Sequence, residues 1–168
     1  MSDKHLIVLT VNGIDHELLV EARWTLLDVL RHQVELTGTH VGCEHGVCGA
    51  CTILVDEEPV RACLVYAVQA EGHAIRTVES LGTPTEPNDL QEAFSARHGL
   101  QCGFCTPGFL MLAEGFLTQR PTPSREEIRE AVSANLCRCT GYQTIVDAIE
   151  DTARRRAGQT DPEPEAVR

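Results

Sequence analysis

Two runs of mainly hydrophobic residues near the start of the chain have the pattern of β-strands. Residues 6–11 alternate and are β-branched at several positions, and residues 14–20 form the second run. Asn12 and Gly13 lie between the two runs. An Asn-Gly pair accepts the positive φ angles of a tight primed turn, so the segment predicts a β-hairpin.

A different period follows the hairpin. Thr25 precedes a group of apolar residues, and Asp28 stands three positions later, as in a capping box. We therefore expect a helix from Thr25 to about Glu35. Strands are expected at Thr52–Val55 and His73–Thr77, with a turn at residues 56–59 after the first of them.

The second half of the chain reads as helical after a break in composition at residues 79–87, which hold two prolines, a glycine and several polar residues. The expected division is an α+β domain at residues 1–80, a linker at 81–88, an all-α domain at 89–157 and a polar, unfolded tail at 158–168. The helix-start signals are Asn88, Thr106 with Pro107, Ser124 with Glu127, and Thr140. The first two of these helices should end near Gly99 and Gln119, and the fourth near Arg156.

Charge and cysteine content narrow the function. The net charge of −11 disfavours binding to nucleic acid or to an anionic membrane. The N-terminus has no signal-peptide pattern, and no apolar run reaches the roughly 18 residues of a membrane helix. These features predict a cytoplasmic protein, in which thiols stay reduced. Its eight cysteines are then expected to be metal ligands or redox groups.

Four of these cysteines form a first set. Cys43, Cys48 and Cys51 have the spacing of plant-type [2Fe–2S] ferredoxins, and Cys63 follows eleven residues later. Glycines within the loop let the backbone wrap closely and bring N–H groups near the sulfurs. Structural zinc is the alternative, but zinc sites usually have two close ligand pairs, so an iron–sulfur cluster is favoured. His40 and His45 flank the loop and are interpreted as solvated or as neighbours of the ligands.

Cys102, Cys105, Cys137 and Cys139 form a second set. By spacing alone, this set could bind zinc or a cluster. Thr106 and Thr140 follow the two pairs and predict helix N-termini there, whose positive dipole ends favour an anionic cluster. The two halves also resemble each other, each being helix, cysteine pair and helix. This repeat predicts a four-helix bundle with an approximate two-fold axis and a cluster where the two loops meet, unless the likeness of such short strings is a coincidence.

Three strings in this order, GCEHGVCGACT, QCGFCTPG and NLCRCTGYQ, resemble the small iron–sulfur subunit of the molybdenum hydroxylases. That family includes xanthine dehydrogenase, aldehyde oxidoreductase, aerobic carbon monoxide dehydrogenase and quinoline 2-oxidoreductase. The resemblance spans about residues 5–156. It implies a ferredoxin-like β-grasp domain followed by a four-helix-bundle domain, each with one [2Fe–2S] cluster.

The resemblance also implies partners: a large subunit with the molybdopterin cofactor and a medium subunit with FAD, assembled as a dimer of heterotrimers. Electrons would pass singly from molybdenum through this chain to FAD, and this chain would hold no catalytic residue of its own. Gln101 and Cys139 would lie against the pterin, which makes the helical cluster the one nearer molybdenum. A capping or solvated side chain is the alternative interpretation of Gln101.

The substrate pocket would lie on another chain. The strings are most similar to those of subunits serving N-heteroaromatic hydroxylases such as quinoline 2-oxidoreductase; aldehydes, carbon monoxide and 4-hydroxybenzoyl-CoA stay open. Two other classes of function compete with this one. A free-standing ferredoxin-type carrier would need no larger partners, and a zinc-stapled adaptor would be colourless.

Overall fold

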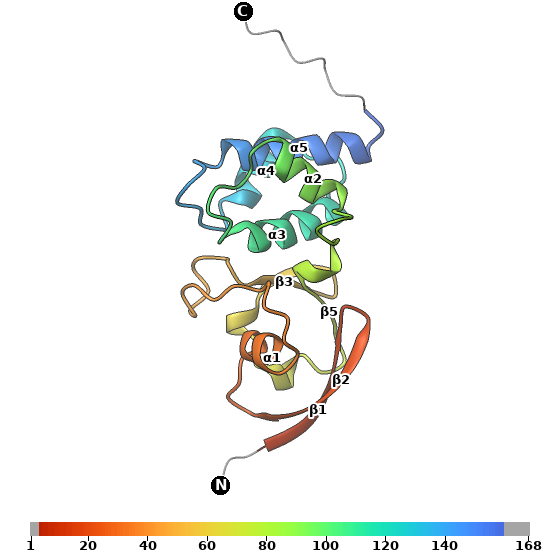
Figure 1. The fold of residues 1–168 in the computed structure, drawn as a ribbon, viewed down its shortest axis with the longest axis vertical. Helices are drawn as coiled ribbons and strands as arrows, with labels where there is room; N and C mark the ends of the chain where they lie inside the picture. Colours follow the sequence, from red (N-terminus) through yellow and green to blue (C-terminus); the bar gives the residue numbers. More distant parts are fainter. Residues whose placement is uncertain (1–3, 160–168) are drawn as a thin grey trace, which may run out of the picture.

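A computed structural model describes residues 4–159 in two parts stacked along the long axis of the molecule (Figure 1). The N-terminal part is a five-stranded sheet with the helix α1 against it, and the C-terminal part consists of helices. Each part has its own hydrophobic core. The predicted α+β architecture is therefore confirmed. Most of the tail predicted at 158–168 lies outside the described residues, and the proposed division at residues 81–88 stays a prediction.

The sheet is mixed, with the strand order β2-β1-β5-β3-β4. β1 pairs with β2 through the predicted hairpin, in which Asn12 and Gly13 have φ angles of 52° and 80°. β1 also pairs in parallel with β5, which brings the start and the end of this part together. The strands are β1 (Lys4–Val11), β2 (Ile14–Glu21), β3 (Thr52–Val55), β4 (Glu58–Arg61) and β5 (Ala74–Arg76).

Helix α1 (Leu26–His32) starts as predicted and ends early. Thr25 and Asp28 form the capping box, and the four apolar residues after Thr25 are buried. The helix was expected to reach Glu35, but Gln33 is its C-cap. Glu35 has a φ of 64°, a left-handed conformation that an α-helix does not contain. The prediction was wrong by about one turn.

The sequence reading missed the strand β4. The turn after β3 takes two residues, Asp56 and Glu57, with φ angles of 51° and 65°. Neither is glycine, so the usual signal of a primed turn is absent. The Asp56 carboxylate accepts hydrogen bonds from the Ala74 N–H and the His73 ring, which ties the turn to the segment leading into β5. Three short 3₁₀ helices follow in this part: η1 (Ala62–Leu64), η2 (Ala67–Gln69) and η3 (Val78–Ser80).

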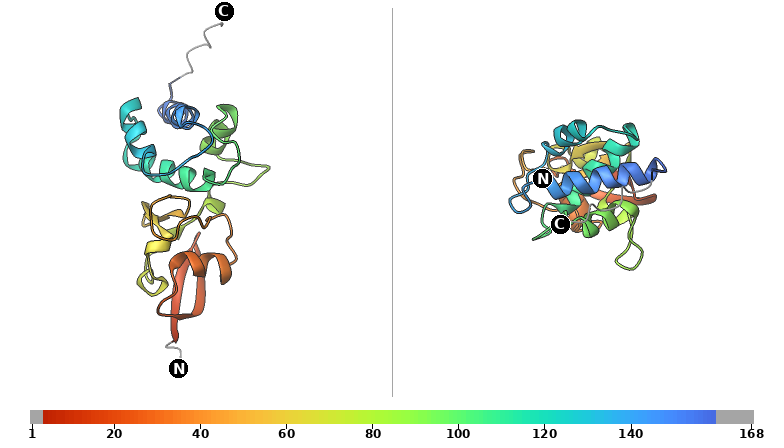
Figure 2. Two further views of the ribbon diagram at one scale, coloured as in Figure 1. Left: turned by 90° about the vertical axis from the view of Figure 1, so that its left-hand side faces the viewer. Right: turned by 90° about the horizontal axis from the view of Figure 1, so that it is seen from above.

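The helical part repeats a short and a long helix. An eight-residue helix precedes a fourteen-residue helix in each half: α2 (Asp89–Ala96), α3 (Thr106–Gln119), α4 (Arg125–Val132) and α5 (Gln143–Arg156). Asn88 and Ser124 cap α2 and α4 as predicted. α2 ends at Ala96, before the expected Gly99, whose N–H bonds to the Phe94 carbonyl and closes the helix. Figure 2 shows α5 lying across the far end of the bundle, where it contacts α2 and α4.

The two parts are packed tightly at α3. A Cβ on Gly108 would lie 2.3 Å from the Gly49 carbonyl oxygen, and one on Gly115 would lie 2.7 Å from the side chains of Leu54 and Pro59. Only glycine allows the helix to approach the sheet part so closely. The cysteine-bearing loop at Gly49 is thus in direct contact with the helix that begins at the second cysteine set.

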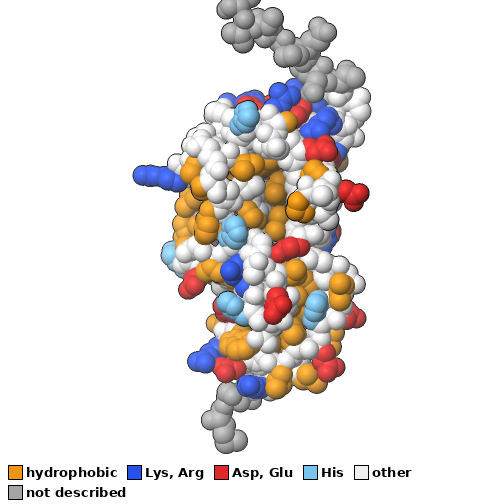
Figure 3. Space-filling view, in the orientation of Figure 1, with side chains coloured by type: hydrophobic (Ala, Val, Ile, Leu, Met, Phe, Trp, Pro, Cys, Tyr) orange, Lys and Arg blue, Asp and Glu red, His pale blue; other side chains and the backbone are white. Residues whose placement is uncertain are grey.

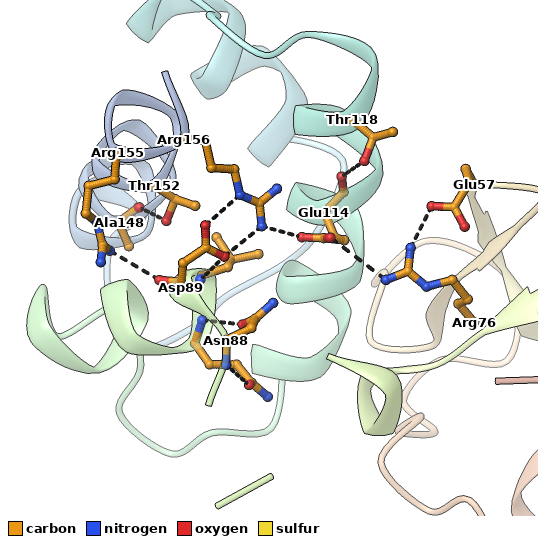
Figure 4. Close-up of polar contacts among 12 residues, drawn as sticks. Glu57, Arg76, Asn88, Asp89, Glu114, Thr118, Ala148, Thr152, Arg155 and Arg156 are labelled. Atoms are coloured by element: carbon orange, nitrogen blue, oxygen red, sulfur yellow. Dashed lines mark hydrogen bonds and ion pairs between the residues drawn. The ribbon is translucent and has the colours of Figure 1, made fainter. Parts of the chain in front are cut away.

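A chain of charged groups joins the same two parts (Figure 4). Arg76 on β5 bonds to Glu57 at 2.6 Å and lies 3.8 Å from Glu114 on α3. Arg156 on α5 bonds to Glu114 at 2.8 Å and forms a two-pronged contact with Asp89. Hydrogen bonding to Arg156 lowers the pKa of Asp89, which keeps that carboxylate ionised. These linked ion pairs orient α3 on the sheet part and α5 on α3.

Candidate metal centres

The first cysteine set lies in the long loop between α1 and β3 and on η1. Cys43 and Cys48 are partly exposed, whereas Cys51 and Cys63 are 3% and 7% exposed and belong to the core of the sheet part. Gly46 and Gly49 have φ angles of 84° and 74°, which turn the loop around the thiols. The set therefore has two thiols near the surface and two inside the protein.

The loop already favours a thiolate at its outer edge. Hydrogen bonds from backbone N–H groups at His45 and Cys48 lower the pKa of Cys43 to about 6. Burial, with the neighbouring Cys51, raises the pKa of Cys63 to about 11. A metal that binds at Cys63 must therefore displace a firmly held proton, which the positive charge of iron or zinc can do.

The second set is formed by two loops that the bundle brings together. Cys102 and Cys105 precede α3, and Cys137 and Cys139 lie between α4 and α5. The sulfurs of Cys102 and Cys139 are 3.5 Å apart. The thiols of Cys105 and Cys137 form the other contact. The predicted meeting of the two loops is confirmed.

In both sets the thiols lie in pairs. Cys43 contacts Cys48 and Cys51 contacts Cys63, just as Cys102 contacts Cys139 and Cys105 contacts Cys137. A zinc site needs four ligands around one ion, whereas two irons can each take one pair. The donor arrangement fits [2Fe–2S] clusters better than zinc.

Thr140 does not cap α5, contrary to the prediction. The helix starts at Gln143, and Tyr142 occupies the N-cap position with a φ of 70°. The Thr140 hydroxyl lies 3.2 Å from the Cys137 sulfur instead. Burial alone would raise the pKa of Cys137, but hydrogen bonds from the Thr140 hydroxyl and N–H outweigh it and lower the pKa. Similarly, α3 starts at Thr106 itself, with Cys105 at the N-cap, so Pro107 is its second residue.

The other flanking residues are placed as follows. Gln101 is exposed, and its Nε2 donates to the Cys139 carbonyl oxygen at 3.1 Å. His40 lies 2.7 Å from the Phe104 carbonyl oxygen and stacks on the Phe104 ring. His45 contacts the Cys43 carbonyl. Both histidines bond to backbone around the cysteines and not to a thiol, in agreement with their interpretation as neighbours of the ligands.

A polar bridge between the two sets was missed by the sequence analysis. The Leu136 N–H donates to the Cys48 carbonyl oxygen at 2.9 Å, and Leu136 is next to Cys137. Asn135 is 1% exposed and donates to the Gly49 carbonyl oxygen, while Arg61 donates to the Ala134 carbonyl oxygen. These residues carry no local signal, since their importance depends on two loops far apart in the sequence.

Comparison with known proteins agrees with this geometry. Residues 9–77 match the family described as a 2Fe-2S iron-sulfur cluster binding domain, and residues 77–150 match a [2Fe-2S] binding domain. Caffeine dehydrogenase subunit gamma of Pseudomonas sp. (strain CBB1) is 58% identical over 152 residues, covering 89% of this chain and 91% of that protein. The chain belongs to the small [2Fe–2S] subunits of the molybdenum hydroxylases. It is an electron-transfer subunit of a multi-subunit, molybdenum-dependent oxidoreductase.

Other relatives show the same unit in different settings. The nicotine 6-hydroxylase small subunit of Paenarthrobacter nicotinovorans is 56% identical, covering 89% of this small subunit and 90% of that protein. The crystal structure of quinoline 2-oxidoreductase from Pseudomonas putida 86 matches with a TM-score of 0.87 and 52% identity, covering 95% of this chain and all of that one. Aldehyde oxidoreductase of Megalodesulfovibrio gigas is 48% identical, but the match covers only 16% of that longer protein.

The described part of this small subunit contains no helix that is both long and apolar enough to cross a bilayer.

Proposed function

We propose that this small subunit relays single electrons from a molybdopterin centre on a large subunit to FAD on a medium subunit. Each bound [2Fe–2S] cluster would supply one-electron redox chemistry. Cys43, Cys48, Cys51 and Cys63 would hold one cluster, and Cys102, Cys105, Cys137 and Cys139 the other. The observation that carries the proposal is the arrangement of the eight thiols. They lie in four contacting pairs, two pairs in the sheet part and two in the helical part.

The chain contributes ligands, their charge and their spacing. Backbone N–H groups stabilise the Cys43 thiolate, and the hydrogen bond from Leu136 to Cys48 holds the two sets in register. That bond also supplies a short route of covalent and hydrogen bonds from one set to the other. No acid, base or nucleophile of this chain is needed for such a role.

The surface around the cysteines supports the proposal that this subunit binds larger partner subunits. Val47, Leu64, Phe104 and Leu136 are hydrophobic side chains exposed by about half or more, and all lie in or beside the cysteine loops. Hydrophobic side chains also gather over the middle and upper part of the face drawn in Figure 3. Exposed apolar groups of this kind commonly mark protein interfaces. We infer that this subunit is part of a dimer of heterotrimers in the cytoplasm. The alternative is a free-standing electron carrier. Purification of the chain without larger subunits would favour that alternative.

We place the helical cluster next to the pterin and the other cluster nearer FAD. Cys102 and Gln101 are exposed, so this edge of the helical part is accessible to a partner. Gln101 uses one N–H to bond to Cys139, which leaves its amide oxygen and a second N–H for a pterin. Gln101 and Cys139 are thus the proposed contacts with the cofactor.

Replacing Gln101 with alanine is expected to weaken pterin docking and slow reduction of the helical cluster about 5- to 10-fold, the loss of roughly one hydrogen bond. Both clusters should still assemble. Rapid-freeze EPR of the assembled enzyme after mixing with substrate measures this, with Gln143→Ala, another exposed glutamine of the helical part, as the control. Unchanged reduction kinetics in Gln101→Ala would remove the docking role. Magnetic coupling of molybdenum(V) to the Cys43 set would reverse the proposed order.

The substrate is proposed to be an N-heteroaromatic compound such as quinoline. The relatives named for caffeine and nicotine, and the structure named for quinoline, act on nitrogen-containing rings. The assembled enzyme, produced together with its large and medium partner subunits, should turn over such rings faster than aldehydes. Turnover of aldehydes, carbon monoxide or 4-hydroxybenzoyl-CoA alone would contradict this substrate class and leave the electron-transfer role standing.

A further inference from the structure

We propose that the Thr140 hydroxyl donates a hydrogen bond to the Cys137 thiolate and thereby raises the reduction potential of the helical cluster. The inference rests on the proposed ligand set, in which Cys137 binds iron. It assigns to Thr140 a tuning role beyond the sequence pattern, which predicted only a helix cap.

Thr140 belongs to a closed ring of hydrogen bonds with Cys137 and Tyr142. The Thr140 Oγ1 lies 3.2 Å and the Thr140 N–H nitrogen 3.5 Å from the Cys137 Sγ. The Cys137 N–H donates to the Tyr142 hydroxyl at 3.0 Å, and the Tyr142 N–H donates to the Thr140 Oγ1 at 3.2 Å. The sulfur therefore has two contacts with Thr140, and the Thr140 hydroxyl lies between Cys137 and Tyr142.

The direction of the bond between Thr140 and Cys137 follows from the partners. Thr140 Oγ1 already accepts from the Tyr142 N–H, so its own proton remains for another acceptor. A cysteine bound to a metal is a thiolate and has no proton to donate. Thr140 must then be the donor and the Cys137 sulfur the acceptor.

The backbone is bent to keep this ring closed. Gly141 and Tyr142 both have left-handed φ angles, 67° and 70°, and Tyr142 carries a bulky side chain in a conformation that such residues rarely adopt. The Tyr142 ring is held edge-on against the buried Phe109, with 6.3 Å between the ring centres. Strain that persists in a well-packed segment indicates that the surrounding contacts enforce it.

The other half of the bundle lacks this feature. Thr106 is the counterpart of Thr140 in the internal repeat, but its hydroxyl is buried and bonds to no described group. Hydrogen bonds to a thiolate ligand stabilise the added negative charge of a reduced cluster and so raise its potential. We therefore expect Thr140, and not Thr106, to raise the reduction potential, and to do so through the Cys137 side of the helical cluster.

The test compares Thr140→Val, which removes the hydroxyl at nearly constant volume, with Thr140→Ser, which keeps it. The matched control is Thr144→Val, because the Thr144 hydroxyl is also buried near the start of α5 and bonds to no described group. Midpoint potentials are measured by EPR-monitored redox titration of the assembled enzyme. Each cluster signal is assigned by a ligand substitution in its own set, and iron content and visible absorption are recorded for every variant.

Thr140→Val is expected to make reduction of the helical cluster about tenfold less favourable, a shift of about 59 mV to more negative potential for a one-electron couple. The first cluster, Thr144→Val and Thr140→Ser should stay at wild-type potentials. An unchanged potential in a fully loaded Thr140→Val overturns the tuning role, and an equal shift in Thr144→Val does the same. Loss of iron from the helical set in Thr140→Val also overturns it, since Thr140 would then serve assembly. A wild-type enzyme without iron at these cysteines would instead refute the ligand sets themselves.

Discussion

Gly49→Ala is expected to destabilise the chain by about 2–4 kcal/mol, the sum of overpacking at a buried contact and of left-handed strain. Gly49 has a φ of 74°, and a Cβ there would lie 2.1 Å from Asn135 Oδ1 and 3.0 Å from the Asn135 Cα. Since Gly49 lies between Cys48 and Cys51, the displaced loop should also bind iron less tightly. Thermal unfolding followed by circular dichroism measures the change.

The control for this experiment is Gly72→Ala. Gly72 has a φ of 82°, but a Cβ there has no atom within 4 Å, so the variant carries the strain without the clash. A loss of only about 1–2 kcal/mol is expected. Adding Asn135→Ala to Gly49→Ala removes the nearest contacting atom and should recover part of the stability. Equal losses in the two glycine variants would show that the approach of Asn135 to the loop is not what Gly49 permits.

Removing iron is expected to unfold much of the chain, and most of all the sheet part. Cys51 and Cys63 lie inside its core, and the loop from α1 to β3 that carries three thiols has no regular helix or strand. Small domains with such loops often depend on a bound metal. The purified chain should be brown and contain iron and labile sulfide in equal amounts. Far-ultraviolet circular dichroism before and after chelation measures the loss of structure.

Two variants separate the clusters in this experiment. Cys51→Ala and Cys105→Ala each remove one proposed ligand, and each is expected to lower the iron content by about half. Cys51→Ala should in addition lower the β-sheet signal, whereas Cys105→Ala should affect mainly the helical signal. An unchanged folded spectrum after complete chelation would contradict the dependence on metal. Zinc in place of iron in the wild-type chain would contradict the proposed clusters.

Local patterns were sufficient where the structural cause is itself local. The Asn12–Gly13 turn, the capping boxes at Thr25 and Ser124, the cap at Asn88, and the change from strand to helix were all predicted and confirmed. Each depends on residues within a few positions of one another, so a window of sequence contains the necessary information. The errors at Glu35 and at the Asp56–Glu57 turn have the same origin. Non-glycine residues adopt positive φ there, which the local sequence does not signal, and at Asp56 the contacts with His73 and Ala74 hold the turn.

Thr140 illustrates the limit of such patterns. A threonine before a helix is a good cap by local rules. In the structure its hydroxyl faces Cys137, because Gly141 and Tyr142 turn left-handed and delay the start of α5. The Tyr142 ring packs edge-on against Phe109, which belongs to another helix, and a contact of this kind is not encoded in the residues around Thr140.

The sequence by itself determined that this chain carries two cysteine sets, one in an α+β part and one in a helical part, since ligand spacing and hydrophobic period are properties of short segments. The ferredoxin-like form of the first part was implied by the family resemblance. The assignment of each cysteine as a ligand and the domain limits remain predictions. Only the tertiary structure paired Cys102 with Cys139 and joined the two sets through Leu136, Asn135 and Arg61. Those contacts link residues tens of positions apart, and they form only when burial of the two cores brings α3 against the first cysteine loop.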